Sequence, residues 1–322
     1  MGITMHAEHI RVPLEASNTS DQSDSVVFLR EETVVLRWLF GYYDERRSHG
    51  LSIVPRWPWR IDSTWNKGEK KTSFRAATLV GIDVDELKEE DGMPVTFHMG
   101  VSIVHTQDLH NQCHLPLRHI SSKPPVIRSV NLLIGDNIYS ARNKSRFCFG
   151  RHRRLSLRNL GAHLKELIGT PCPLILVVHG GYRETNLLER LGINLQPMFT
   201  IDTIEAARYP MQVFYNFTLR GLLETFGIPF NSYHLHVAGN DAHFILRALL
   251  MIAVADARRE LEKLPVWLPV FEAIARAALP AIPPLCDAGE AMRRAKQLQK
   301  ARLKRHSIAA MDTGLVLRTD IS

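Results

Sequence analysis

Apolar residues along this chain gather in short runs that are typical of strands, separated by turns and polar stretches. The run over 76–85 is rich in β-branched residues and ends in acidic ones, which predicts a buried strand. After a short charged turn, the run over 94–104 predicts its hairpin partner, and 126–134 predicts a third strand. The run over 173–178 is almost wholly apolar, as in a strand covered on both faces, and 198–202 predicts a last short strand.

Helices are predicted between and after these strands. The stretch 157–168 carries apolar residues at helical spacing, and the helices predicted over 184–191 and 219–226 are each followed by a glycine that can end them. The apolar run 244–254 predicts a long buried helix that continues to residue 264. Three strands followed by alternating helices and strands indicate an α/β fold with a mixed sheet, antiparallel at first and parallel later, flanked by helices.

The sequence divides into four parts. Residues 1–25 are polar and predict a disordered arm, and 26–75 predict an irregular segment rich in aromatic residues and proline. Within that segment, 34–43 predict a short helix that docks on the main domain or on a partner. Residues 76–264 predict the folded domain. Residues 265–322 predict a Pro-broken segment with a basic helix and tail, either a solvated terminal helix or a phosphate-binding or nuclear-import tail.

Composition permits several partners and excludes few. With 40 Lys and Arg against 33 Asp and Glu, the chain carries a net charge of +7, which permits a polyanionic partner without requiring one. Its four cysteines are scattered, without a C-x-x-C pair, and indicate free thiols in a reducing compartment. We find neither a secretory signal nor an apolar run of about 18 residues, so we expect an intracellular protein, cytoplasmic or nuclear, that does not bind membranes.

A basic cluster lies between the third predicted strand and the helix that follows it. Basic residues interleaved with aromatic ones are what a groove for single-stranded nucleic acid uses. An ordinary surface of loop and helix entry explains the same pattern. The candidate nucleic-acid-binding residues are Arg146, Arg151, Arg153 and Arg154, close to Phe147 and Phe149.

Two aspartates, Asp83 and Asp85, lie at the end of the first predicted strand with one residue between them. Because side chains alternate along a strand, both carboxylates lie on one face, whereas Glu86 points to the other. Neighbouring carboxylates repel each other, and a divalent cation that prefers oxygen ligands, such as Mg²⁺ or Mn²⁺, explains the pair best. A turn that begins with acidic residues is the alternative interpretation.

A second acidic position comes late in the chain. His236 and Asp241 are five positions apart across a Gly-Asn turn, at the start of the long apolar helix. An imidazole and a carboxylate at such a junction can serve a metal ion, act as a general base, or make ordinary loop contacts.

Other polar residues have structural explanations. We expect Asp202 to be structural, His179 to be a turn residue, and His243 to be a packing or surface residue. Residues 105–119 predict a long polar loop whose histidines and cysteine match no standard zinc spacing.

Taken together, these pieces resemble the DEDDh 3′–5′ exonucleases of the ribonuclease-H-like fold. More narrowly, they resemble a fungal branch found in proteins linked to mRNA export and Argonaute-associated RNA silencing. The resemblance covers residues 76–257, and its most specific motif is the last. The motifs are Asp83-Val-Asp85, Phe147-Cys-Phe-Gly150 with Leu155-Ser-Leu157, Val178-His-Gly-Gly181, Ile201-Asp-Thr203 and His236-Val-Ala-Gly-Asn-Asp-Ala242.

The resemblance implies a site and a reaction. Two Mg²⁺ or Mn²⁺ ions would be bound by Asp83, Asp85 and Asp241, with Glu184 as a fourth acidic group. His236 would accept the proton of the attacking water. The implied partners are single-stranded RNA or DNA and RNA-processing or silencing proteins.

Three positions depart from the family pattern. Asp85 stands where the family has Glu, Glu184 stands where it has Asp, and His98 stands where it has Glu before a glycine. Two functions therefore stay open: a Mg²⁺- or Mn²⁺-dependent 3′–5′ exonuclease, or a catalytically inactive nucleic-acid-binding or scaffold module in an RNA-processing or silencing complex.

Overall fold

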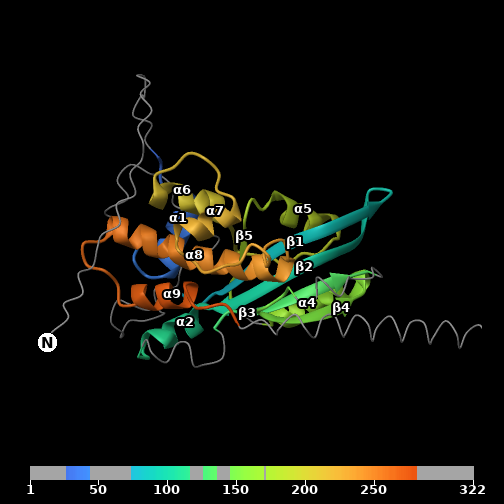
Figure 1. Ribbon diagram of the computed structural model, residues 1–322, viewed down its shortest axis with the longest axis horizontal. Helices are drawn as coiled ribbons and strands as arrows, with labels where there is room; N and C mark the ends of the chain where they lie inside the picture. Colours follow the sequence, from blue (N-terminus) through green and yellow to red (C-terminus); the bar gives the residue numbers. More distant parts are fainter. Residues whose placement is uncertain (1–26, 44–73, 117–125, 136–145, 170–171, 281–322) are drawn as a thin grey trace, which may run out of the picture.

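The computed structural model describes residues 27–43, 74–116, 126–135, 146–169 and 172–280. The predicted disordered arm over 1–25 and the predicted basic helix near the C-terminus lie outside these residues. At the centre of the described part is a six-stranded sheet in the order β4-β3-β2-β1-β5-β6, and Figure 1 shows its strands spread from β5 and β1 down to β3 and β4. Its strands are β1 (Thr78–Glu90), β2 (Met93–His105), β3 (Arg128–Ile134), β4 (Gly150–Leu155), β5 (Leu174–Val178) and β6 (Phe199–Asp202).

The strand directions confirm the predicted mixed sheet. β1 pairs antiparallel with β2, and β2 pairs antiparallel with β3. β5 is parallel to both β1 and β6, and β4 is parallel to β3. The helices are α1 (Glu31–Leu39), α2 (Thr106–Cys113), the 3₁₀ turn η3 (Leu157–Asn159), α4 (Leu160–Ile168), α5 (Tyr182–Arg190), α6 (Thr203–Met211), α7 (Leu219–Thr225), α8 (Ala238–Glu260) and α9 (Leu268–Ala275).

Alternate residues of the central strands face two separate cores. Leu79 of β1 and Val104 of β2 pack with α8, in one core with α1, α6, α7 and α9. Val80 and Met99 point the opposite way and pack with α4 and α5. This alternation is what strand geometry imposes. It also decides that Gly81, Asp83 and Asp85, which continue the series from Leu79, lie on the α8 face.

Four elements differ from the sequence-based expectations. β4 forms where we expected a loop, because a charged edge strand needs few apolar residues. α2 forms inside the expected polar loop, where it buries little beyond Thr106 and Leu109. α6 was not expected at all. α9 forms inside the expected Pro-broken segment, because its proline falls in the first helical turn, where a missing N–H costs no hydrogen bond.

Helix α8 is the central helix of the fold. Residues Ala238 to Val254 are buried without interruption, which is unusual for a helix beside a single sheet. By length and composition it could cross a membrane, although the sequence showed no uninterrupted apolar run of that length. The relevant stretch is 94% buried inside the structure, as in the core helix of a globular protein.

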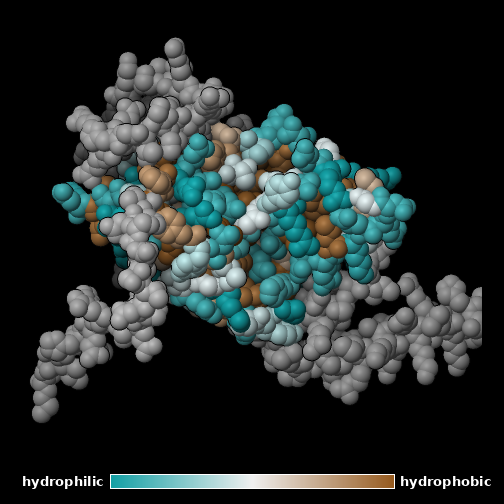
Figure 2. All heavy atoms as spheres, turned by 90° about the horizontal axis from the view of Figure 1, so that it is seen from above, coloured by the Kyte–Doolittle hydropathy of each residue, from teal (hydrophilic) through white to brown (hydrophobic). Residues whose placement is uncertain are grey.

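Exposed large apolar side chains of the described residues come from several parts of the chain, among them Phe28 before α1, Tyr182 in α5 and Val266 between α8 and α9. From the side drawn in Figure 2, apolar areas are small and divided by polar ones. The described cysteines, Cys113, Cys148 and Cys172, are free thiols.

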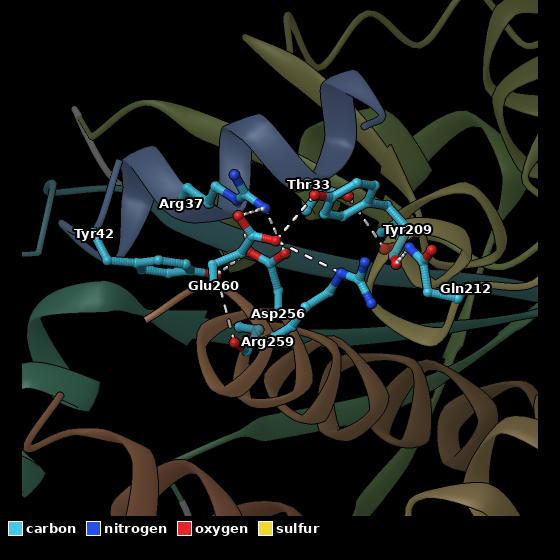
Figure 3. Close-up of polar contacts among 10 residues, drawn as sticks. Thr33, Arg37, Tyr42, Tyr209, Gln212, Asp256, Arg259 and Glu260 are labelled. Atoms are coloured by element: carbon cyan, nitrogen blue, oxygen red, sulfur yellow. Dashed lines mark hydrogen bonds and ion pairs between the residues drawn. The ribbon is translucent and has the colours of Figure 1, made fainter. Parts of the chain in front are cut away.

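Helix α1 docks on the far half of α8 through a buried ion pair. Arg37 donates two hydrogen bonds of 2.8 Å to the carboxylate of Asp256, whose side chain is fully buried. The Tyr42 hydroxyl donates to the same carboxylate at 3.1 Å, and Glu260 lies 3.4 Å from Arg37 (Figure 3). The short helix predicted over 34–43 is therefore α1, over Glu31–Leu39, and it docks on the main fold.

We expect Arg37→Ala to lower the free energy of unfolding by about 3–5 kcal/mol, because it leaves the Asp256 carboxylate buried without its cation. Arg259→Ala is the control: it removes a partly exposed pair with Glu260 and a contact with the Tyr209 ring, and should cost less than about 1 kcal/mol. Urea unfolding of the two variants measures both losses. A loss below about 1 kcal/mol for Arg37→Ala would show that the ion pair does not anchor α1.

Candidate active site

The first turn of α8 lies directly against the backbone of β1 and β2. A Cβ atom placed on Gly100 would be 1.8 Å from the carbonyl oxygen of Ala238, and one on Gly81 would be 2.7 Å from that of Ala242. Such distances are far inside van der Waals contact, so only glycine permits this approach. Two glycines on neighbouring strands thus fix where α8 begins on the sheet.

Asp83 is the residue of β1 that pairs with Gly100, and Asp85 pairs with His98. Both aspartates follow Gly81, the last residue of β1 that pairs with β5. The strand itself continues to Glu90, so the two aspartates lie within it and not at its end as expected. Their carboxylates nevertheless lie where the parallel part of the sheet ends, next to the start of α8.

Asp241 and Glu184 bring carboxylates from two helices. Asp241 lies in the first turn of α8 and is 7% exposed, and Glu184 lies in the first turn of α5 and is 5% exposed. The Oδ2 atom of Asp241 accepts a hydrogen bond of 2.9 Å from the backbone N–H of His236. Asp241 Oδ1 and Glu184 Oε2 are both buried and have no hydrogen-bond partner among the residues that the structure describes. Buried oxygens without partners are rare and costly, and call for an additional ligand.

Burial and the neighbouring acids raise the pKa values of Asp83 and Asp241. Burial raises the pKa of Asp83 well above its usual range, and the charges of Asp241, Glu184 and Asp85 raise it further, while Arg183 opposes them. Burial likewise raises the pKa of Asp241 to about 7, and Asp85 raises it too, while the His236 N–H and the charge of Arg146 lower it. Like charges that shift each other's pKa must lie within a few ångströms to about 10 Å. The strand pair and the two helices therefore converge on one acidic site.

Burial also raises the pKa of Glu184. Its own backbone N–H, the cation of Arg183 and the backbone N–H of Val84 lower it. Val84 is the residue of β1 between Asp83 and Asp85. Its hydrogen bond therefore places the Glu184 carboxyl against β1, next to the two aspartates. Arg183 was missed in the sequence; its position directly before Glu184 was the available signal.

The acidic site is not a finished metal centre. Within the described ranges, no three His, Cys, Asp or Glu side chains are already gathered closely enough to hold an ion. The donor chemistry does fit a hard divalent cation, since the unsatisfied oxygens belong to carboxylates. Asp83, Asp85, Glu184 and Asp241 are thus the candidate ligands.

His236 stands at the edge of this site with its side chain exposed. Its φ of 61° lies in the left-handed region, which is costly for a residue with a Cβ atom. Its backbone N–H is the donor to Asp241. The turn between His236 and Asp241 thus links the two residues, and the His236 side chain is open to solvent.

His98 and Glu86 form a second polar pair beside Asp85. His98 is 6% exposed, its Nδ1 atom lies 3.6 Å from Glu86 Oε2, and burial lowers its pKa. We expected Glu86 to point to the opposite face. That expectation was wrong, because a bulge after Asp85 gives Glu86 a φ of 52° and breaks the alternation of side chains.

The four candidate nucleic-acid-binding arginines do not share one surface. Arg153 lies on the α4 side, where its Nη1 atom is 2.9 Å from His163 Nε2, and strand alternation places Arg151 there too. Arg154 alternates to the α8 face and pairs with Leu133, which pairs with His98. Arg146 contacts the loop that carries His236. Only Arg154 and Arg146 therefore lie on the face of the acidic site.

Three other polar residues make structural contacts. The Asp202 carboxylate accepts hydrogen bonds from the backbone N–H groups of Gly180, Gly181 and Ile204 at 2.9–3.2 Å. It therefore caps α6 and fixes the turn before α5. His179 lies 2.9 Å from the hydroxyl of Thr203, and His243 is buried with its ring stacked on Phe149.

A known family covers the region that carries this site. A family model described as the DNA polymerase III subunit epsilon-like, C-terminal domain matches residues 78–252, more than half of the 322-residue chain. No curated protein matches the chain. The matched region runs from the first residue of β1 into α8 and contains all four candidate carboxylates and His236. Proteins of this family are nucleases of the ribonuclease-H-like type that generally use divalent metal ions. The chain belongs to the DEDDh exonuclease family.

Proposed function

We propose that this protein is a Mg²⁺- or Mn²⁺-dependent 3′–5′ exonuclease that acts on single-stranded nucleic acid. One observation carries the proposal: two buried carboxylate oxygens without partners, on α5 and α8, face a site whose other acids are Asp83 and Asp85. Burial and mutual repulsion make the site unfavourable while all four groups are charged. Bound cations would remove that cost.

The acidic residues would hold the ions. Asp83, Asp85 and Asp241 are the proposed direct ligands, and Glu184 coordinates directly or through water. Bound ions supply an activated water and stabilise the charge on the scissile phosphate and the leaving 3′ oxygen. Asp85 is one methylene shorter than the family residue and Glu184 one longer. Glu184 is buried against β1, so its added length extends into the site.

His236 is the proposed general base. Its exposed imidazole would accept the proton of the attacking water as the phosphorus–oxygen bond forms. The hydrogen bond from the His236 backbone N–H to the Asp241 carboxylate holds the proposed base close to the proposed metal ligand. Arg154, on the same face, is a proposed contact for the phosphate backbone of the substrate.

A catalytically inactive nucleic-acid-binding or scaffold module is the second candidate. The observation that favours it is that the described acids do not form a ready-made set of three ligands. For either function we propose a functional domain over 76–264, partners in RNA processing or silencing as in the fungal branch named above, and a cytoplasmic or nuclear location.

We expect the full chain to shorten a 5′-labelled single-stranded oligonucleotide from its 3′ end in Mn²⁺ or Mg²⁺, and not in EDTA. Asp83→Ala and His236→Ala should each reduce the rate by about 10²–10⁴-fold, since each removes a group required in the transition state. Asp108→Ala, an exposed acid on α2, is the matched control and should cleave normally. Binding of the oligonucleotide without shortening would favour the inactive module and contradict the exonuclease.

The raised pKa of Asp241 predicts a pH-dependent stability in EDTA. An unfolded Asp loses its proton near pH 4, whereas the folded Asp241 keeps it until about pH 7, so its contribution falls as pH rises through this window. The stability of Asp241→Asn relative to wild type should therefore rise by about 1.4 kcal/mol per pH unit between about pH 4 and 7. Urea unfolding at several pH values measures the difference, and a difference independent of pH would contradict the prediction. At pH 8, Mn²⁺ should make the wild type more stable than Asp241→Asn, because the ion stabilises only the protein with the Asp241 carboxylate.

A further inference from the structure

The Arg146 side chain donates hydrogen bonds to the backbone just before His236. Its Nε atom donates a hydrogen bond of 2.6 Å to the carbonyl oxygen of Tyr233, and its Nη2 atom donates one of 2.8 Å to that of Leu235. The guanidinium also lies over the Tyr233 ring, 4.8 Å from its centroid. Two parallel N–H groups of one planar fork thus hold two alternate carbonyls of one loop. This geometry is specific to Arg.

Asn240 ties the same loop from the other side. Its side-chain NH₂ donates to the carbonyl oxygens of Arg146 and His234, both at 2.8 Å. Its side-chain oxygen accepts from the backbone N–H of Cys148 at 3.1 Å. Asn240 is fully buried in the first turn of α8, directly before Asp241. Three segments meet here: the chain entering β4, the loop before His236, and the start of α8.

The loop needs such ties because His236 has an unfavourable backbone conformation. A left-handed residue with a Cβ atom persists only when its surroundings fix it. Leu235, whose carbonyl Arg146 holds, is the residue directly before it. His236 in turn donates its N–H to Asp241, so a movement of this loop changes both the imidazole and the hydrogen bonding of the carboxylate.

We propose that Arg146 is a positioning residue that holds the loop of His236 in place, and not a contact for the phosphate backbone of nucleic acid. The inference rests on the proposed nuclease function for its kinetic consequence. The two roles make different demands on the side chain. A phosphate contact requires a positive charge, which Lys also supplies, whereas holding two carbonyls requires the fork.

The kinetic test compares Arg146→Lys with Arg146→Ala on a 5′-labelled single-stranded oligonucleotide in Mn²⁺. Positioning predicts that both variants lower kcat by about tenfold or more, with KM within about twofold of wild type, because a small misplacement of a catalytic group is costly. Arg158→Ala, an exposed arginine in η3, is the control and should match wild type. If Arg146→Lys cleaves normally while Arg146→Ala raises KM and loses about one unit of salt slope, Arg146 binds phosphate and the inference fails.

A second measurement needs no activity. Hydrogen exchange of the His236 and Asp241 amides in the full chain should become about tenfold faster or more in both Arg146 variants, while the β5 amides keep their protection and show that the fold is intact. Unchanged exchange at His236 would overturn the inference. If the wild type shortens no oligonucleotide, the nuclease proposal fails, and exchange alone still decides the role of Arg146.

Discussion

The close approach of α8 to Gly100 and Gly81 is the contact on which the candidate site depends. A side chain at Gly100 would overlap the Ala238 carbonyl, so any other residue would lift the first turn of α8 from the sheet. That turn carries Asp241, and Asp83 is the residue paired with Gly100. One steric condition on two strands therefore sets the separation between the acids of the sheet and the acid of the helix.

The burial of several carboxylates close together is electrostatically unfavourable, and this cost indicates a binding site for cations. Burial and mutual repulsion raise the pKa values of Asp83 and Asp241, and two carboxylate oxygens stay without partners in the described part of the chain. A fold designed only for stability would not place these groups together, since each unpaired buried charge is costly. The buried pair of Arg37 and Asp256 shows the contrast, because there the same fold gives a buried carboxylate its cation. Among the described residues, the acids of the site form no such ion pair, although the charges of Arg183 and Arg146 act on them. They fit divalent cations, as expected for a member of the DEDDh exonuclease family.

Much of the fold could be predicted from the sequence, because strong apolar runs mark β1, β2, β3, β5 and α8. β4 could not, since its arginines make it look like a loop, and α9 could not, since proline at a helix start is indistinguishable from a break. Asp83, Asp85 and Asp241 could be identified as candidates from their positions in the sequence. Glu184, and the assignment of all four acids to one site, came only from the family resemblance, because D-x-D alone is common. The sequence could not reveal how Glu86 turns at the bulge beside Asp85. Nor could the sequence show that Arg146 binds backbone carbonyls, because every residue type has a backbone carbonyl and the partner therefore cannot be recognised from the sequence.

The most direct test of this account is the affinity for Mn²⁺, measured by calorimetry on wild type, Gly100→Ala and Gly161→Ala. In Gly161→Ala the new methyl group would lie 3.5 Å from Ile193 on the opposite face of the sheet, an ordinary contact that should leave binding unchanged. In Gly100→Ala the start of α8 must move, so we predict affinity at least about tenfold weaker, or about 1.4 kcal/mol. Equal affinity in Gly100→Ala and wild type, or no Mn²⁺ binding by the wild type, would contradict the account.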